Sequence, residues 1–375
     1  MLKNFIESLI GLIKFIKLSK EEKEFVFYSE SRFYRNYYFD LILNLKKINQ
    51  NNIVLITSDK YDLKYFKNEI KCIYIGNFFI LTYFFKTLNC KFMIMTLTDL
   101  GNHFHKSKLC KYYVYIFHSM GSTHQQYTNQ AFKNYDIVLA NGAYQSKELK
   151  LTEIKSGFPK KEIINSGYIF LDNLIAKANL NLKESKHILF APSWNYNKEN
   201  LFDDYSIDII SYLLSEDFKI TLRPHPEHYK RSIKTINKIK NLFSTNQNFI
   251  LDKNSNNLNS LEKSEIIITD NSNIVFEYMF VFKRPIIYMN YKDKVHNISK
   301  DKINIPTIEE EFKSQFGNII NVNDLKNLPQ LCKKLIINNN ISDQKVNSFA
   351  KEYLSNIGNS AFFAANYLNK KSKSK

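Results

Sequence analysis

Residues 266–289 read IIITDNSNIVFEYMFVFKRPIIYM, and this stretch holds two short apolar runs separated by a helical pattern. The first run ends at Thr269 and Asp270, and Ser272 and Asn273 are residue types that open helices. Alternating strands and helices of this kind are typical of parallel α/β units. The stretch therefore predicts an α/β fold.

Similar apolar runs recur from residue 23 onward, with amphipathic stretches between several of them. The further runs that we expect to be strands are EFVFYS (24–29), NIVLITS (52–58), KCIYI (71–75), KFMIMT (91–96), YYVYIFH (112–118), DIVLAN (136–141), HILFAP (187–192), FKITLRP (218–224) and NFILD (248–252). A chain of 375 residues exceeds what one core usually organises. We therefore predict two Rossmann-like domains of parallel sheet that face each other across a cleft, a GT-B-like architecture.

The change in composition around residues 173–186 is the expected seam between the two domains. We accordingly predict an amphipathic N-terminal helix over 1–22, a first domain over 23–180 and a second over 181–340. A helix and a basic tail occupy 341–375, and we expect this helix to pack against the first domain.

Net charge and cysteine usage limit the partners of the chain. The net charge of +17 favours polyanions such as nucleic acid, anionic lipid or phosphate-rich substrates. The four cysteines are scattered without a CxxC pair, so neither a zinc site nor a disulfide framework is indicated, and a reducing compartment fits best. With no GxGxxG or GxxxxGK motif, phosphate must be held by helix N-termini and side chains. We expect no cofactor and no metal.

The N-terminal stretch MLKNFIESLIGLIKFIKLSK has apolar residues at helical spacing. It is too short and interrupted to span a bilayer, and it lacks a signal-peptide cleavage site. Two interpretations stay open: a helix lying in the membrane interface, or a helix packed on its own domain. The closing run KKSKSK can add attraction to an anionic leaflet.

The segment YIFHSMGSTHQQY (115–127) places His118 at a strand end, where an imidazole can act as a general base. The residues Ser119, Ser122 and Thr123 then turn the chain into a helix and are candidates to line the cleft. The alternative is a capping loop with an incidental histidine.

In TLRPHPEH (221–228), two prolines bracket His225 and restrict the backbone around it. Arg223 offers a guanidinium fork for phosphate two residues earlier. Because a rigid turn has little other purpose here, this motif is more specific than a lone histidine.

Polar residues follow two more of the predicted strands. The helix opened by Ser272 and Asn273 exposes N–H groups that bind anions, and Glu277 lies one turn later, where it can accept hydrogen bonds from ribose. Simple capping and a solvated carboxylate are the alternatives. In HILFAPSWNYN (187–197), Ser193 and Trp194 directly follow a strand, although core packing is the ordinary role of a tryptophan.

The strand–His118–turn segment, APSW, RPHP and TDNSNxxFE, in this order, resemble the CDP-glycerol glycerophosphotransferase family, which includes teichoic acid primases and polymerases. The likeness covers roughly residues 90–290 and includes TLTDLGNHFHKSK (96–108), similar to a TxPDLxN-type segment of capsule-associated relatives. This chain has His-Ser-Met-Gly-Ser-Thr where the polymerases have His-Gly-Thr, and Asn271-Ser272-Asn273 where Tyr-Ser-Ser is usual.

The resemblance implies a GT-B fold with an acceptor-side first domain and a second domain that binds the CDP-linked donor. It implies two catalytic histidines, which correspond to His118 and His225. The implied donor phosphate and nucleotide contacts correspond to Arg223, Ser272, Asn273 and Glu277. We add Ser193 and Asp270 as donor-binding candidates, because each lies where a predicted strand ends, and Trp194 as a cleft candidate.

We therefore predict a cytoplasmic transferase on the inner face of the membrane that moves glycerol phosphate, or a similar alditol phosphate, onto a lipid-linked or polysaccharide acceptor. Attack of the acceptor hydroxyl on the β-phosphorus releases CMP. One alternative is a GT-B glycosyltransferase that uses a CMP- or UDP-linked sugar. A nucleic-acid-binding protein is disfavoured, because the basic residues are spread along the chain without a known module. His103 and His105 are too weak a pair to indicate a metal.

Overall fold

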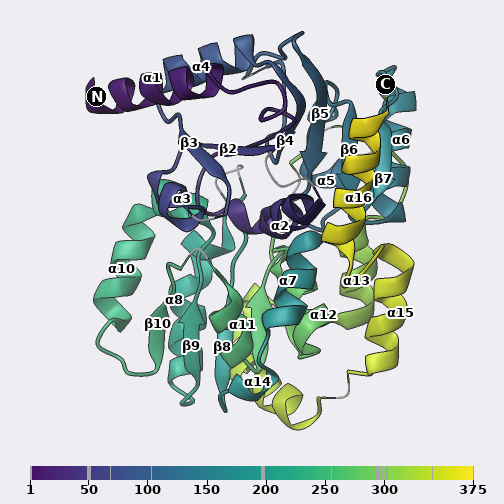
Figure 1. Cartoon of the computed structure of the whole chain (residues 1–375). Helices are drawn as coiled ribbons and strands as arrows, with labels where there is room; N and C mark the ends of the chain where they lie inside the picture. Colours follow the sequence, from purple (N-terminus) through teal and green to yellow (C-terminus); the bar gives the residue numbers. More distant parts are fainter. Residues whose placement is uncertain are drawn as a thin grey trace. The chain divides into compact units, whose positions relative to one another are not determined.

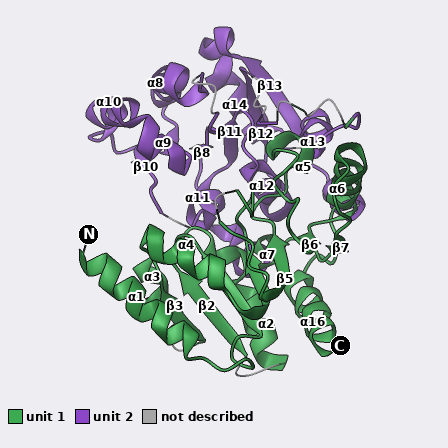
Figure 2. Ribbon diagram, turned by 90° about the horizontal axis from the view of Figure 1, so that it is seen from above, with its two compact units in different colours: residues 1–173, 299–303, 353–375 green, residues 174–298, 304–352 purple. Residues whose placement is uncertain are grey.

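The computed structural model describes residues 2–48, 52–67, 69–102, 104–195, 199–254, 256–292, 296–297, 299, 303–339 and 341–374. The chain divides into two compact units (Figure 2). Unit 1 comprises Met1–Asn173, Ser299–Ile303 and Tyr353–Lys375, and unit 2 comprises Leu174–Ile298 and Asn304–Glu352. His103 lies outside the described residues.

The described residues of unit 1 form a parallel sheet with the strand order β3-β2-β1-β4-β5-β6-β7 (Figure 1). The strands are β1 (Phe25–Ser29), β2 (Ile53–Thr57), β3 (Lys71–Tyr74), β4 (Cys90–Met95), β5 (Cys110–Ile116), β6 (Ile137–Ala140) and β7 (Glu162–Asn165). The helices are α1 (Leu2–Ile16), η1 (Arg35–Tyr37), α2 (Phe39–Ile48), α3 (Lys60–Tyr65), α4 (Phe78–Thr87), α5 (Thr123–Gln126), α6 (Ala143–Ser156), α7 (Ile169–Lys177) and α16 (Ser360–Lys373).

Both faces of this sheet are buried, because alternate strand residues enter two separate cores. In β1, Val26 and Tyr28 pack in the core that contains residues of α1 and α4. Phe25 and Phe27 pack in the opposite core, to which α2 and α16 contribute. The C-terminal helix α16 therefore lies against the first sheet, whereas α15 (Asp343–Tyr353) belongs almost entirely to unit 2.

The described residues of unit 2 form a second parallel sheet with the order β10-β9-β8-β11-β12-β13. Its strands are β8 (His187–Phe190), β9 (Lys219–Leu222), β10 (Phe249–Leu251), β11 (Ile266–Thr269), β12 (Ile286–Asn290) and β13 (Gly317–Asn321). Its helices are η2 (Leu180–Leu182), α8 (Leu201–Leu214), α9 (Pro226–Arg231), α10 (Ile233–Phe243), α11 (Leu258–Lys263), α12 (Ile274–Phe282), α13 (Ile308–Phe316), η4 (Val322–Asn327) and α14 (Leu328–Ile337), with α15 following. The prediction of two parallel α/β sheets is confirmed.

Helix α1 contacts β3 and α4 through a narrow face of Ser8, Gly11, Leu12 and Phe15. A Cβ atom on Gly11 would lie 2.1 Å from the carbonyl oxygen of Tyr74, so only glycine permits this close approach. Most of its larger apolar side chains are exposed instead, namely Leu2, Phe5, Ile6, Leu9, Ile10, Ile13 and Ile16. The packed face thus combines the small residues Ser8 and Gly11 with Leu12 and Phe15.

None of the helices in the described part of the chain is both long enough and apolar enough to span a lipid bilayer.

Candidate functional site

The site residues of each unit lie at the carboxyl edge of its sheet, close to the point where strand order reverses. In unit 1 this point falls between β1 and β4, and in unit 2 between β8 and β11. Ligands of open α/β sheets bind at such switch points, where loops diverge to opposite faces of the sheet. Each unit therefore presents one candidate half-site, and each half-site is described separately.

In unit 1, His118 follows β5 and is half-buried among aromatic rings. The ring centroids of Tyr34, Tyr37 and Tyr127 lie 5.5, 5.9 and 6.3 Å from that of the imidazole. Burial lowers the pKa of His118 to about 4, and its Nδ1 is buried without a hydrogen-bond partner among the described residues. The free protein therefore holds a neutral imidazole with an unsatisfied ring nitrogen at neutral pH.

A buried carboxylate holds the loop after His118 in place. Oε2 of Glu148 accepts hydrogen bonds from the backbone N–H and the hydroxyl of Thr123, at 2.6 and 2.8 Å. Ser122 is the N-cap residue of α5, is fully buried and makes no side-chain capping hydrogen bond. The hydroxyl of Ser119 accepts from the N–H of Gly121 at 3.2 Å. Thr123 and Ser122 thus shape the loop rather than line an exposed surface, contrary to the expectation from sequence.

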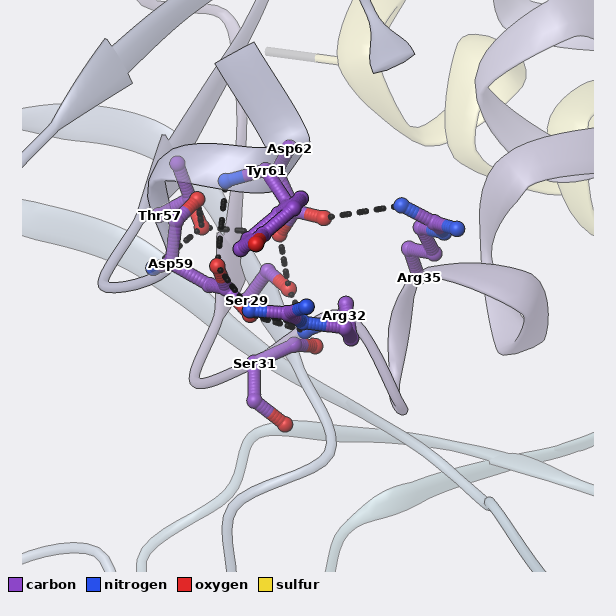
Figure 3. Close-up of polar contacts among 8 residues, drawn as sticks. All are labelled: Ser29, Ser31, Arg32, Arg35, Thr57, Asp59, Tyr61 and Asp62. Carbon is purple, nitrogen blue, oxygen red and sulfur yellow. Dashed lines mark hydrogen bonds and ion pairs between the residues drawn. The ribbon is translucent and has the colours of Figure 1, made fainter. Parts of the chain in front are cut away.

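A polar cluster that the sequence reasoning missed follows β1 and β2 (Figure 3). Arg32 forms a two-bonded ion pair with Asp59, and Arg35 lies next to the buried Asp62. Asp62 in turn accepts hydrogen bonds from Ser29 and Thr57, the last residues of β1 and β2. The segment that carries the two arginines also carries Tyr34 and Tyr37, so it joins the cluster to His118.

In unit 2, Arg223 follows β9 and is directed toward acidic and carbonyl groups of its own unit. Its Nη1 lies 2.5 Å from Asp252, and its Nη2 donates to the carbonyl of Asn254 at 2.9 Å. Asp252 also accepts from the hydroxyl of Ser260. Two N–H groups of Arg223 are thus engaged within unit 2, and the prediction that the guanidinium binds phosphate concerns its remaining N–H groups.

His225 is the N-cap residue of α9, and its side chain is exposed. Its Nδ1 accepts a hydrogen bond from the N–H of Glu227 at 3.3 Å. A neutral imidazole that accepts at Nδ1 carries its proton on Nε2. The rigid Pro224–His225–Pro226 turn thus presents a hydrogen-bond donor, the form suited to a phosphate oxygen.

Ser193 and Asp270 connect the loops after β8 and β11. The N–H and the hydroxyl of Ser193 donate to the two carboxylate oxygens of Asp270 at 2.7 and 2.8 Å. His228 is another residue that was not predicted from the sequence. Its Nε2 lies 3.1 Å from the carbonyl oxygen of Ser193, and its ring contacts the rings of Trp194 and Phe202. The side chains of Ser193, Asp270 and His228 are buried, and Trp194 packs in the core, the ordinary role of this residue type.

The helix α12 begins after Asn273, which is the N-cap residue but makes no side-chain capping hydrogen bond. The N–H of Ser272 donates to the hydroxyl of Thr269 at 3.3 Å. Glu277 is only 7% exposed and accepts a hydrogen bond from Asn257 at 2.8 Å, so it is not a solvated helix carboxylate. The predicted donor residues therefore follow the neighbouring strands β9, β8 and β11, at one edge of the sheet.

Metal ligands do not gather at either half-site. Across the described residues, no group of three or more His, Cys, Asp or Glu side chains is arranged to hold a metal ion. The polar chemistry present is that of cations, imidazoles and backbone N–H groups, which is the chemistry that binds phosphate.

Solved structures share this fold at low sequence identity. A structure of the wall teichoic acid polymerase TagF has a TM-score of 0.58 and 15% identity, covering 100% of this chain and 99% of that chain. Another TagF structure, soaked with CDPG, has a TM-score of 0.59 and 16% identity, covering 99% and 98%. UDP-GlcNAc 2-epimerase from Methanocaldococcus jannaschii, in complex with UDP-GlcNAc and UDP, has a TM-score of 0.60 and 13% identity, covering 92% and 99%. These similarities confirm the GT-B-like fold.

The curated proteins contain no sequence match to this chain. The family model described as CDP-Glycerol:Poly(glycerophosphate) glycerophosphotransferase matches residues 81–321, which include His118, Arg223, His225 and the segment from Asp270 to Glu277. The matched region is more than half of the chain. The chain therefore belongs to the CDP-glycerol:poly(glycerophosphate) glycerophosphotransferase family and is an enzyme of that class.

Proposed function

We propose that unit 1 binds the acceptor and supplies the base, and that unit 2 binds CDP-glycerol. The observation that carries this assignment is the neutral imidazole of His118, whose buried Nδ1 has no hydrogen-bond partner among the described residues. A base must be unprotonated before it can accept a proton, and His118 meets this condition over the whole physiological pH range. An anionic substrate beside the ring raises its pKa toward the value at which a base is most effective.

In the proposed reaction, His118 accepts the proton of an acceptor hydroxyl, whose oxygen attacks the β-phosphorus of CDP-glycerol. The bond between this phosphorus and the bridging oxygen breaks, and CMP leaves with the electron pair. Phosphoryl transfer requires positioning and charge stabilisation more than covalent help. His225 donates from Nε2 to a phosphate oxygen, and Arg223 and the N-terminus of α12 at Ser272 and Asn273 supply further positive potential.

The buried groups of unit 2 have supporting roles in this proposal. Asp270 holds the loop of Ser193 next to β11, and His228 and Trp194 pack beneath that loop. Oε2 of Glu277 accepts a hydrogen bond from Asn257. Glu277 therefore contacts the ribose through its other carboxylate oxygen, or through Oε2 after this hydrogen bond rearranges. We therefore assign nucleotide positioning to this pair together.

The assignment of His118 is tested by measuring CMP release from CDP-glycerol in the presence of acceptor. His118→Ala should lower kcat by about 100-fold to 10,000-fold, the usual contribution of a general base. The affinity for CDP-glycerol should stay within about twofold. His105→Ala is the matched control, because His105 is an exposed histidine of the same unit. Near-wild-type turnover by His118→Ala would contradict the assignment.

We also propose that α1 and α4 attach unit 1 to the inner face of the cell membrane. The exposed apolar side chains of α1 are joined by Phe78, Phe79 and Tyr83 of α4, which are 66%, 74% and 54% exposed. The two helices lie side by side (Figure 1). The ring centroids of Phe15 and Phe84 are 5.0 Å apart. One face of α1 packs on unit 1 and the other is available for lipid, so the two interpretations of this helix are compatible.

Cosedimentation with vesicles that contain anionic lipid tests the attachment. Replacing Ile13 and Phe79 together by serine should weaken binding by about tenfold or more, because two apolar side chains that the lipid would bury are lost. Ile154→Ser on α6 is the control, since Ile154 is 73% exposed on another helix of unit 1. Unchanged binding of the Ile13 and Phe79 double variant would contradict this proposal.

A further inference from the structure

Arginine is rare in this chain, which contains five arginines and 48 lysines. Lysine satisfies a need for positive charge alone, whereas a guanidinium provides a planar fork that stacks on rings and binds oxyanions through two hydrogen bonds. Arg284 is buried and donates to backbone carbonyls of unit 2, and Arg231 pairs with Glu227 on the surface. Arg32 and Arg35, by contrast, stand three positions apart in the loop that follows β1.

Arg32 is held on two sides. Its Nε and Nη2 donate to the two oxygens of Asp59 at 2.7 and 3.1 Å, and its guanidinium lies 3.5 Å from the ring centroid of Tyr61. Burial opposes ionisation of Asp59, but the hydrogen bonds from Arg32 and from backbone N–H groups lower the pKa of this carboxyl. The guanidinium is therefore fixed in orientation, while its remaining N–H groups face away from Asp59.

Arg35 is held in the same manner but with fewer hydrogen bonds (Figure 3). Its guanidinium lies 3.9 Å from the ring centroid of Tyr65, and its Nη1 lies 3.6 Å from Oδ1 of Asp62, beyond hydrogen-bond distance. Its Nε is buried without a hydrogen-bond partner among the described residues. A preorganised guanidinium with an unsatisfied donor is suited to bind an oxyanion.

The two carboxylates are more deeply buried than the guanidinium groups that pair with them. The side chain of Asp62 is fully buried and that of Asp59 is 14% exposed, whereas those of Arg35 and Arg32 are 18% and 35% exposed. A ligand that approaches from solvent therefore meets the two cations first. The same loop contacts the His118 ring through Tyr34 and Tyr37. Since β1 and β5 are separated only by β4, their ends lie about 10 Å apart.

We propose that Arg32 and Arg35 bind a phosphate of the acceptor chain, upstream of the hydroxyl that reacts at His118. This inference rests on the proposed function, in which unit 1 binds the acceptor, and it takes as that acceptor the poly(glycerophosphate) of the family's description. A chain whose terminal hydroxyl lies at His118 and which runs along the carboxyl edge of the sheet brings an earlier phosphate over β1. The pair thereby selects acceptors that already carry phosphate.

Calorimetric titration of the full chain with a short oligomer of glycerol phosphate tests the site without donor or turnover. Arg35→Lys and Arg32→Lys keep the charge but lose the fork, and each should weaken oligomer binding by about tenfold or more. Their affinity for CDP-glycerol should not change. Lys46→Ala is the control, because it removes a charge from the last turn of α2, toward the opposite edge of the sheet.

Two results would overturn the proposal: undetectable binding of the oligomer to the wild type, or wild-type affinity in both lysine variants. Thermal unfolding identifies any variant that does not fold, and Arg32→Lys remains decisive if Arg35→Lys fails this check. Loss of binding to phosphatidylglycerol vesicles with intact oligomer binding would assign the site to lipid headgroups and also contradict the proposal. Absence of CMP release by a wild type that binds the oligomer would contradict the proposed function instead.

Discussion

In both half-sites a buried carboxylate holds a loop that follows a strand, but the two histidines have different surroundings. In unit 1, Glu148 accepts from the N–H and hydroxyl of Thr123, and in unit 2, Asp270 accepts from the N–H and hydroxyl of Ser193. Each carboxylate fixes the loop that follows a strand. In unit 1 this arrangement leaves a half-buried His118 with an unsatisfied nitrogen, whereas in unit 2 His225 is exposed and accepts at Nδ1.

Under the proposed function, this difference separates a proton acceptor, His118, from a hydrogen-bond donor, His225. The aromatic surroundings of His118 keep it neutral, as general-base catalysis requires. The turn that holds His225 keeps its side chain exposed, with Nδ1 accepting from Glu227, so a neutral ring has its donor at Nε2, as stabilisation of a phosphate oxygen requires. Two histidines in one enzyme can thus have complementary roles because their surroundings differ, even though their intrinsic chemistry is the same.

The largest expected effect distinguishes two histidines within unit 2. His225→Ala should lower kcat by about 100-fold or more, because it removes a phosphate-binding donor, and should cost only about 1 kcal/mol of stability as a lost cap. His228→Ala should lower the free energy of unfolding by about 2–4 kcal/mol, because a buried ring is replaced by a cavity. Initial rates and chemical denaturation measure both quantities. Equal effects of the two variants on kcat at saturating donor would refute this separation of roles.

The next effect tests whether the two loops are held by equivalent carboxylates. Asp270→Ala and Glu148→Ala each leave an N–H and a hydroxyl without their acceptor, so each should lower the free energy of unfolding by about 2–4 kcal/mol. Denaturation in urea gives this free energy. A neutral result for either variant would mean that its loop is not held by the carboxylate.

The smallest effect concerns pH and the unit 1 histidine. The pKa of His118 is lowered by burial from 6.5 to about 4, so between these values the unfolded chain binds a proton that the folded chain does not. The contribution of His118 to stability is therefore constant above pH 6.5 and falls as the pH drops toward 4, by less than about 1.4 kcal/mol per pH unit. His118→Gln should reduce this slope. An identical slope in the variant would show that the ring is not shielded from water.

Much of the fold follows from local apolar patterns, and the edge strands show where these patterns fail. Strands β1 and β11 are buried along their whole length and were recognised as apolar runs. Of the four edge strands that the described residues form, β3 and β10 were predicted from their apolar runs, whereas β7 and β13, which keep polar or half-exposed residues, were missed. A strand with one neighbour needs fewer apolar side chains, so its sequence carries a weaker signal.

The site could be predicted where a distinctive turn follows a strand, as at His118 and in the RPHP segment. Partners distant in the sequence could not be predicted, and they engage groups that the sequence assigned to the donor. Arg223 donates a hydrogen bond to Asp252, and the hydroxyl of Ser193 donates one to Asp270. Arg32 and Arg35 lie in SESRFYRNYYF, which matches no motif. The one signal available was the scarcity of arginine in a lysine-rich chain.

The most direct test of the central claim measures which nucleotide is released, and what the acceptor gains, with CDP-glycerol, CDP-ribitol and UDP-GlcNAc in turn. We expect CDP-glycerol to yield CMP, in equal amount to the glycerol phosphate added to an acceptor that carries a glycerol phosphate chain. Release of UDP with transfer of a sugar, or no acceptor-dependent CMP release from CDP-glycerol, would contradict this expectation.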